Sequence, residues 1–271
     1  MKSTCNGKRY TLINMALNEV VLIGAGNVAT HLGTALQQAG CRVLQVYSRT
    51  EASAAALAEK LGTAYVISLE EVRCDAGLYI VALKDAALQE LVPQIVKGRE
   101  RALFVHTAGS MPMQLWEGYA SRYGVLYPMQ TFSKRRKVDW MEVSIFVETN
   151  RPEELSALKA LAGRLTPKVY EATSDQRKYL HIAAVFACNF SNHMYALCEH
   201  LLGSHGIPFE VMLPLIDETA RKVHELTPRE AQTGPAIRYD ENVINRHLVM
   251  LEAEPRLQEL YEKISKSIYN L

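Results

Sequence analysis

Short apolar runs alternate with segments of helical periodicity along the first part of the chain. The apolar runs predict strands at residues 20–23, 43–47, 64–67, 78–83, 103–106, 143–148 and 169–171. Between them the pattern predicts helices, most clearly over 28–39 and 53–61, and Gly40, Gly62 and Gly98 stand where helices are expected to end. Apolar strands that alternate with helices are typical of a parallel sheet covered by helices on both faces.

The pattern changes near residue 172, where the apolar strands stop. A helical stretch without Gly or Pro runs from about 174 to 202, and further helices are predicted at 209–225, 241–252 and 256–268. The sequence therefore predicts an α/β domain over 20–172, with a doubly wound and mostly parallel sheet, followed by an all-helical domain over 173–271. Residues 1–19 form a lead-in segment whose apolar part is too short for a signal peptide, and Met15 is an alternative natural start.

The first predicted strand runs directly into the glycine-rich turn "GAGNVA", residues 24–29, and a helix follows at once. A dinucleotide site needs Gly24 for a tight turn, Gly26 for the close approach of the pyrophosphate, and a small residue such as Ala29 for helix packing. This context predicts a Rossmann-type domain in which Gly24, Gly26, Asn27 and Val28 bind the cofactor. A glycine-rich turn without a ligand is the alternative.

The end of the second predicted strand indicates which dinucleotide is bound. NAD sites usually carry Asp or Glu there, whereas this chain has Ser48, Arg49 and Thr50. A guanidinium flanked by hydroxyls suits a 2′-phosphate, so these residues favour NADP over NAD. In the alternative interpretation, Ser48 or Thr50 caps the next helix and Arg49 is solvated.

Two further strand ends, "VALKD" and "VHTAGS", are expected near the reactive end of the cofactor. Ala82 and Leu83 are predicted to contact the cofactor, and Lys84 to contact the cofactor or the substrate. His106 and Ser110 are predicted to lie near the substrate. Lys84 can equally be a surface residue, and His106 can be a histidine hydrogen-bonded inside the fold.

The long helical stretch carries a polar stripe. Lys178, His181, Val185, Asn189 and Asn192 fall on one face at helical spacing, while most of the remaining surface is apolar. A helix that is apolar nearly all round is expected to be buried, so its polar groups need partners. Those partners would be backbone groups, a dimer mate or a substrate beside the cofactor. We predict His181 as a proton donor and Asn189 and Asn192 as orienting amides, with a structural helix contact as the alternative.

Two polar segments lie outside this helix. The loop "TGPAIRYD", residues 233–240, presents Arg238, which is expected either to fasten the loop or to reach an anionic group of the substrate. The basic run 134–137 is most simply a solvated loop, and a role toward anionic ligands is the alternative.

Composition and charge exclude several classes of function. The 271 residues carry a net charge of +1, and nucleic-acid-binding proteins usually show a marked basic bias. No apolar stretch approaches the length of a membrane span. The five cysteines show neither a CxxC motif nor metal-ligand spacing, which predicts reduced thiols in the cytoplasm and no metal site.

Several segments together resemble a family named as NADP oxidoreductases, in which a Rossmann-like domain precedes a C-terminal helical domain of unknown function. They are "LIGAGNVATHLGTAL", "VYSRTEASAAALAEKLG", "VHTAGS", "YPMQTFS", "HIAAVFACNFSNHMYAL" and "TGPAIRYD". More distantly the chain is similar to pyrroline-5-carboxylate reductase and the deazaflavin-dependent NADP oxidoreductases, whose helices often dimerise. The resemblance implies NADP binding and a cleft, with these residues: Gly24, Gly26 and Arg49 for NADP; His181, Asn189, Asn192 and Arg238 for the cleft.

Two departures limit what the resemblance implies. β-Hydroxyacid dehydrogenases place Lys and Asn one helical turn apart, whereas Ile182 follows Lys178 at that spacing here. The turn is also poorer in glycine than that of the deazaflavin enzymes. We therefore expect an NADP-dependent reductase, as a homodimer, that acts on a small carbonyl or imine substrate. The alternative is a non-catalytic protein that binds or senses NADP(H).

Overall fold

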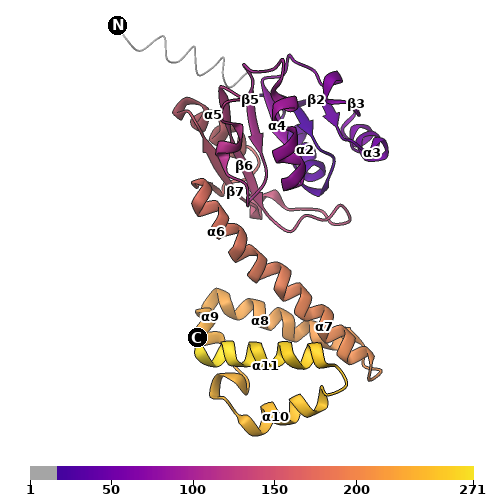
Figure 1. The fold of residues 1–271 in the computed structure, drawn as a ribbon, viewed down its shortest axis with the longest axis vertical. Coiled ribbons are helices and arrows are strands. Elements are labelled where there is room, and N and C mark those ends of the chain that lie inside the picture. Colours follow the sequence, from indigo (N-terminus) through magenta and orange to yellow (C-terminus); the bar gives the residue numbers. More distant parts are fainter. Residues whose placement is uncertain (1–16) are drawn as a thin grey trace. The chain divides into compact units, whose positions relative to one another are not determined.

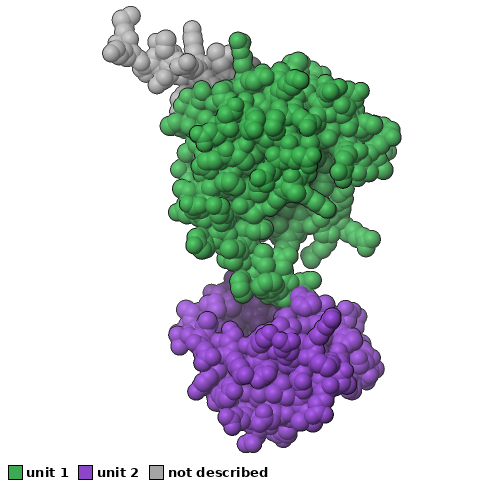
Figure 2. Space-filling model, in the orientation of Figure 1, with its two compact units in different colours: residues 1–192 green, residues 193–271 purple. Residues whose placement is uncertain are grey.

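The computed structural model describes residues 17–271, and contacts divide the chain into two compact units, residues 1–192 and 193–271 (Figure 2). The sheet ends at Glu171, close to the predicted boundary near residue 172. The units divide later, after Asn192, because the first part of the long helical stretch packs with the sheet. Most of the predicted lead-in segment, including Met15, lies outside the described residues.

The first unit is built on one eight-stranded sheet with the order β3-β2-β1-β4-β5-β6-β7-β8 (Figure 1). Neighbouring strands are parallel from β3 to β6, β6 and β7 are antiparallel, and β7 and β8 are parallel. The predicted doubly wound, mostly parallel Rossmann-type sheet is thus confirmed. The strands are β1 Glu19–Ile23, β2 Arg42–Tyr47, β3 Ala64–Val66, β4 Leu78–Val81, β5 Leu103–His106, β6 Arg122–Met129, β7 Ser144–Thr149 and β8 Val169–Glu171.

Helices connect these strands and form the whole of the second unit. Those of the first unit are α2 Asn27–Gln38, α3 Glu51–Leu61, α4 Asp85–Val96, α5 Pro152–Ala162 and α6 Ser174–Ala184, with short 3₁₀ helices at Leu69–Glu71, Met113–Trp116 and Trp140–Glu142. A π-helical turn, Val185–Phe190, joins α6 to α7, Ser191–Gly203, which continues into the second unit. That unit contains α8 Leu213–Glu225, α9 Pro228–Ala231, α10 Glu241–Met250, α11 Pro255–Asn270 and 3₁₀ helices at Phe209–Met212 and Ala236–Arg238.

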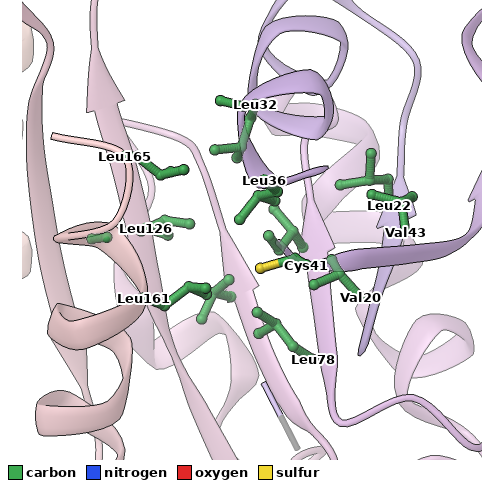
Figure 3. Packing of buried hydrophobic residues seen from close by; sticks show 14 of the residues in the cluster. Val20, Leu22, Leu32, Leu36, Cys41, Val43, Leu78, Leu126, Leu161 and Leu165 are labelled. Carbon is green, nitrogen blue, oxygen red and sulfur yellow. The ribbon is translucent and has the colours of Figure 1, made fainter. Parts of the chain in front are cut away.

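The core of the first unit lies on both faces of the sheet. On one face, Val20 and Leu22 of β1 belong to a buried cluster with residues of α2 and α5, such as Leu36 and Leu161 (Figure 3). The alternate residues of β1 belong to the opposite cluster, which α4 covers. Because β1 is buried on both sides from Val20 to Ile23, it is apolar over these residues, as the sequence pattern indicated.

Strand β6 was not predicted from the sequence. It contains Gly124 and Pro128, and both residue types are unusual inside strands. A Cβ at Gly124 would lie 2.2 Å from the carbonyl oxygen of Glu148 on β7, so the close antiparallel pairing needs glycine there. The tertiary contact with β7, which no local pattern reveals, explains the strand.

The long helical stretch is present, but two of its predicted features differ. The π-helical turn widens it between α6 and α7, and such turns often occur at functional sites. The prediction that this helical stretch is buried is wrong for the single chain, because the side chains of Tyr179, Ile182 and Phe186 are 76%, 53% and 64% exposed. These apolar side chains lie on the surface of the chain as described.

The second unit buries little of its apolar surface. Among residues 193–271, the buried side chains are Ala236, Ile244 and Ser265. Large apolar side chains on α8 and α10 remain exposed, including Leu215 and Met250. A helical unit of this kind lacks the core that normally stabilises a domain.

Candidate functional site

The glycine-rich turn joins the ends of three neighbouring strands. Gly24 has a φ of +118°, and its N–H donates to the carbonyl of Tyr47, at the end of β2, over 2.7 Å. A Cβ at this position would lie 2.4 Å from the carbonyl oxygen of Ala82, which follows β4. Both the backbone conformation and the space therefore require glycine, as predicted for the tight turn of a dinucleotide site.

The backbone beyond this turn leaves room for an anion. No heavy atom lies within 4 Å of a Cβ built on Gly26, and Gly26 is the N-cap of α2. No side chain of the described residues caps this helix, and its first turn holds no acidic residue. Free N–H groups and the positive end of the helix dipole at an open N-terminus form a binding site for phosphate groups.

The loop after β6, residues 130–134, is fastened to the start of α2 by three contacts. The side-chain amide of Asn27 donates to the carbonyl of Phe132 over 2.9 Å. The Nε2 atom of His31 lies 2.8 Å from the carbonyl oxygen of Ser133. The ammonium of Lys134 donates to the carbonyl of Ala25 over 3.0 Å. The structure thus places Lys134 at the glycine-rich turn, although a solvated loop was the simpler interpretation of the basic run.

Arg49 is exposed at the end of β2, and it forms no ion pair within residues 17–271. Thr50 is the N-cap of α3, but its hydroxyl does not cap the helix. Instead, the hydroxyl of Ser48 accepts from the N–H of Thr50 over 3.4 Å. The guanidinium of Arg49 therefore remains available to a ligand.

The two other predicted strand ends are linked to each other. The hydroxyl of Ser110, after β5, donates to the carboxylate of Asp85, the first residue of α4. Lys84 is exposed just before that helix, and Leu83 packs partly buried beside the glycine-rich turn. The structure thus brings Ala82, Leu83 and Ser110 to the carboxyl edge of the sheet, where cofactors bind in such folds.

His106 is enclosed in the protein, so it does not face a substrate. Its side chain has no exposed surface, Nδ1 accepts from the N–H of Ala108 over 3.2 Å, and its ring stacks on Trp116. Burial, and then the positive charge of Arg177, lower the pKa of His106 to about 3. The prediction that His106 lies near the substrate is therefore wrong. The alternative, a histidine hydrogen-bonded inside the fold, describes this environment.

Tyr127 and His181 form the central pair of the candidate site. The Tyr127 hydroxyl, near the end of β6, lies 3.4 Å from Nδ1 of His181 on α6. A Cβ at Gly109 would lie 2.7 Å from Nδ1 of His181 and 2.8 Å from Cζ of Tyr127. Burial raises the pKa of Tyr127, although the charge of Arg177 opposes the effect, so the hydroxyl stays protonated at neutral pH.

A buried ion pair holds α6 in place beneath this pair. The guanidinium of Arg177, which is 1% exposed, lies 2.6 Å from the carboxylate of Glu148 on β7. It also donates to the carbonyls of Ala108 and Met111, on either side of Gly109. Ser174 completes the network by donating to Glu148 from both its N–H and its hydroxyl. The network positions His181, which lies one helical turn after Arg177.

The other predicted members of the polar stripe do not join His181. Lys178 pairs with Asp175 on the same helix. Asn189 lies on the π-helical turn and lines a pocket of about 730 Å³ with the loop after β6. Asn192 is exposed, and Arg238 is exposed in the second unit.

Sequence reasoning missed three residues of the site: Tyr127, Glu148 and Arg177. Tyr127 lay inside the quoted segment "YPMQTFS", and Arg177 precedes His181 by one turn, so a helical-neighbour pattern was available for that residue. Within residues 17–271, no three side chains of His, Cys, Asp or Glu cluster as metal ligands. The described helices include none that is both long and apolar enough to cross a bilayer.

Comparisons with known proteins agree with this geometry. Residues 6–127 match the model of a Rossmann-like domain, and residues 143–268 match a domain of unknown function, DUF2520. The crystal structure of the "putative NADP oxidoreductase" of Bacteroides fragilis is 58% identical in sequence, with a TM-score of 0.91 over 95% of this chain and 100% of that one. This chain belongs to the same family. The resemblance that the sequence segments indicated is thereby confirmed.

More distant members of the fold carry the names of reductases. An imine reductase from Myxococcus stipitatus in complex with NADP+ is 16% identical, with a TM-score of 0.64 over 93% of this chain and 92% of that one. The 1-pyrroline-5-carboxylate reductase of Streptococcus pyogenes is 13% identical, with a TM-score of 0.60 over 93% and 98%. These two likenesses show the shared fold. Among curated proteins, none matches the chain.

Proposed function

We propose that this protein is an NADP-dependent oxidoreductase that transfers hydride between NADP(H) and a small carbonyl or imine substrate. The observation that carries the proposal is the open backbone at Gly26, which leads into the uncapped N-terminus of α2. The name of the Bacteroides fragilis relative and the reductase fold support the same class of reaction.

The residues around the turn fit NADP. Gly24 makes the tight turn, Gly26 leaves the space that a pyrophosphate needs, and the first turn of α2 offers N–H groups to it. The ammonium of Lys134, held at the carbonyl of Ala25, adds a positive charge beside these groups. Arg49 is free to bind a 2′-phosphate, and no acidic residue stands at the end of β2 to bind a ribose hydroxyl instead.

Bound NADPH would supply the hydride, and the chain's own residues would manage the proton. The Tyr127 hydroxyl lies 3.4 Å from Nδ1 of His181, close enough to hold the imidazole ring in one orientation. In this proposal His181, in its imidazolium form, gives the proton on Nε2 to the oxygen or nitrogen of the substrate and is left as a neutral imidazole. In this proposal Lys84 contacts the cofactor and Ser110 contacts the substrate. Asn189, which lines the pocket beside the loop after β6, serves as an orienting amide.

Calorimetric titration with NADPH and NADH tests the cofactor. We expect NADPH to bind about tenfold or more tightly than NADH, and Arg49→Ala to remove that preference because only NADPH carries the 2′-phosphate. Arg101→Ala removes an exposed arginine elsewhere and is expected to change neither affinity. Binding of neither nucleotide to the unaltered protein would contradict the proposal.

A panel of carbonyl and imine compounds, followed by NADPH absorbance, tests the reaction. Oxidation of NADPH with at least one compound, lost in His181→Gln, is the expected result. Tight binding of NADPH with no oxidation across the panel would instead support a protein that senses NADP(H) without catalysis.

We also propose that two copies of the chain form a homodimer through the helical unit. The exposed apolar side chains of α8 and α10 in a unit with few buried residues support this, because a second copy would supply the missing core. Analytical ultracentrifugation of Leu215→Lys is expected to show monomers. His224→Lys, which adds the same charge on the opposite side of α8, is expected to remain dimeric. A monomeric unaltered protein would refute the proposal.

The thiols are consistent with a reducing compartment. Cys41, Cys74, Cys188 and Cys198 form no disulfide among the described residues. We therefore propose the cytoplasm as the location of the protein.

A further inference from the structure

A second cationic hollow lies beside the candidate cofactor site, on the flank of α2. His31, Thr34, Ala35 and Gln38, which share one helical face, form one wall of this pocket of about 410 Å³. Lys60 of α3 and the basic run 134–137 form the rest, together with Val138 and Trp140. We define this hollow as the basic pocket.

The charges of the basic pocket are all of one sign. Its lining contains five permanently cationic side chains and no carboxylate: Lys60, Lys134, Arg135, Arg136 and Lys137. None of the five forms an ion pair within the part of the chain that the structure describes. Like charges held this close repel one another, so a bound anion would relieve a cost that the folded chain otherwise bears.

The loop that carries the basic run is held in place without an anion. His31 is 2.8 Å from the carbonyl oxygen of Ser133, and its ring stacks on Phe132. Phe132 in turn packs on Trp140, whose side chain lines the pocket. Because the aromatic contacts and hydrogen bonds fix both ends of the basic run, the site is already ordered and a ligand loses less entropy on binding.

The basic pocket is separate from the cofactor site in its residues. Its lining includes none of the residues 24–28 or 48–50, which are the candidates for binding the dinucleotide. It uses the middle and end of α2, whereas a cofactor pyrophosphate needs the start of that helix. Lys134 alone touches both regions, because it lines the pocket and donates to Ala25.

We propose that the basic pocket binds a small molecule that carries two or more phosphate groups. Arginine and lysine together favour phosphate oxygens, and five cations exceed what one phosphate needs. The volume of about 410 Å³ lies within the usual range of small-molecule sites and leaves room for more than one phosphate group. No function follows from the comparisons for this pocket, and the proposal stands whether or not the chain binds NADP.

Calorimetric titration with inorganic tripolyphosphate, at constant ionic strength, tests the proposal. We expect binding to the unaltered protein, and binding about tenfold or more weakly to the double variant Arg135→Ala/Arg136→Ala, since each removes a charge-assisted contact. The matched control Lys97→Ala/Arg101→Ala removes the same net charge from exposed positions outside the pocket, and we expect its affinity to stay within about twofold. Inorganic phosphate is expected to bind far more weakly than tripolyphosphate.

Four results would overturn the proposal. They are absent binding of tripolyphosphate, equal losses in the two double variants, complete displacement by saturating NADPH, and tighter binding of a single-stranded oligonucleotide than of tripolyphosphate. The third would assign the anion to the cofactor site, and the fourth would assign the surface to nucleic acid. If NADPH does not bind at all, the tripolyphosphate affinities of the two double variants still show whether the anion binds in the basic pocket.

Discussion

The hydroxyl of Tyr127 lies 3.4 Å from Nδ1 of His181, and the two rings meet edge to face. Tyr127 is 8% exposed and its pKa is raised by burial, so it remains a proton donor at neutral pH. A contact at Nδ1 orients the imidazole ring, so Nε2 is the ring nitrogen that the proposed mechanism uses. In the mechanism that we propose, the pair would supply a proton at the carboxyl edge of the sheet, where the reactive end of a dinucleotide lies in folds of this kind.

Replacement of His181 is expected to separate turnover from cofactor binding. His181→Gln removes the proton donor, so turnover should fall by roughly 10²–10⁴, while the affinity for NADPH stays nearly unchanged. Tyr127→Phe keeps the ring but loses the hydroxyl, and a smaller loss of about tenfold is expected. Steady-state kinetics with the best compound of the panel provide the measurement. Lys178→Gln, an exposed change on the same helix, serves as the control, and unchanged turnover in His181→Gln would remove this residue from the mechanism.

Gly109 determines how closely His181 and Tyr127 approach the strand ends. Gly109→Ala adds a Cβ that would meet Nδ1 of His181 at 2.7 Å and Cζ of Tyr127 at 2.8 Å. Both rings must move, so we expect turnover to fall about tenfold or more, with a loss of stability of about 1–3 kcal/mol. Kinetics and urea unfolding measure the two effects. Gly203→Ala adds a Cβ that meets no atom within 4 Å, at a position whose φ, like that of Gly109, is not positive, so it controls for the loss of a glycine alone.

The fold was largely predictable because its signals are local. Strand β1 is apolar from Val20 to Ile23, Gly24 follows it, and a helix begins after Gly26, so the pattern and the turn chemistry agree. Strand β6 could not be predicted in the same way. Its Gly124 is explained only by the carbonyl of Glu148 on another strand, and this contact leaves no local pattern.

The candidate site was only partly predictable, for a related reason. His181 could be singled out as a polar residue on an apolar helix, and the structure gives it a partner. The π-helical turn then changes the helical spacing, so Asn189 borders the loop after β6 rather than continuing the stripe. The identity of the partners, Tyr127 above all, depends on strand pairing that a single sequence does not reveal.

Removal of Arg177 is expected to destabilise the first unit strongly. Arg177→Ala leaves the carboxylate of Glu148 buried without its cation, which costs about 3–5 kcal/mol. Urea unfolding of the full chain provides the measurement. The double variant Arg177→Met/Glu148→Leu removes both charges and is expected to be more stable than Arg177→Ala. If the double variant is less stable than Arg177→Ala, the loss of stability in Arg177→Ala does not arise from an unpaired charge.

His106 makes stability depend on pH. Its pKa is lowered from 6.5 to about 3 in the folded state, so below pH 6.5 the unfolded chain binds a proton that the folded chain does not. The contribution to stability is complete above pH 6.5 and is lost progressively as the pH falls toward 3. Replacing His106 should therefore reduce the dependence of the free energy of unfolding on pH, by up to about 1.4 kcal/mol per pH unit.

His106→Asn tests this dependence, because the amide oxygen can still accept from the N–H of Ala108. Urea unfolding of the variant at a series of pH values between 6 and 4 is compared with the unaltered protein. His224→Asn, at an exposed position, is expected to keep the original slope. A slope for His106→Asn that equals the original would show that this histidine is not kept neutral by burial.

Lys134 is expected to contribute to cofactor affinity through its place at the glycine-rich turn. Its ammonium donates to the carbonyl of Ala25, which brings a positive charge beside the backbone that would bind a pyrophosphate. Lys134→Ala should weaken NADPH binding by about 3–10-fold, as expected for one partly solvated charge-assisted contact, and more at low salt than at high salt. Lys137→Ala removes an equal charge from the same loop without that contact, so its effect should be smaller at every salt concentration. Calorimetric titrations at two salt concentrations measure the difference, and equal losses for the two lysines would mean that only the general charge of the loop matters.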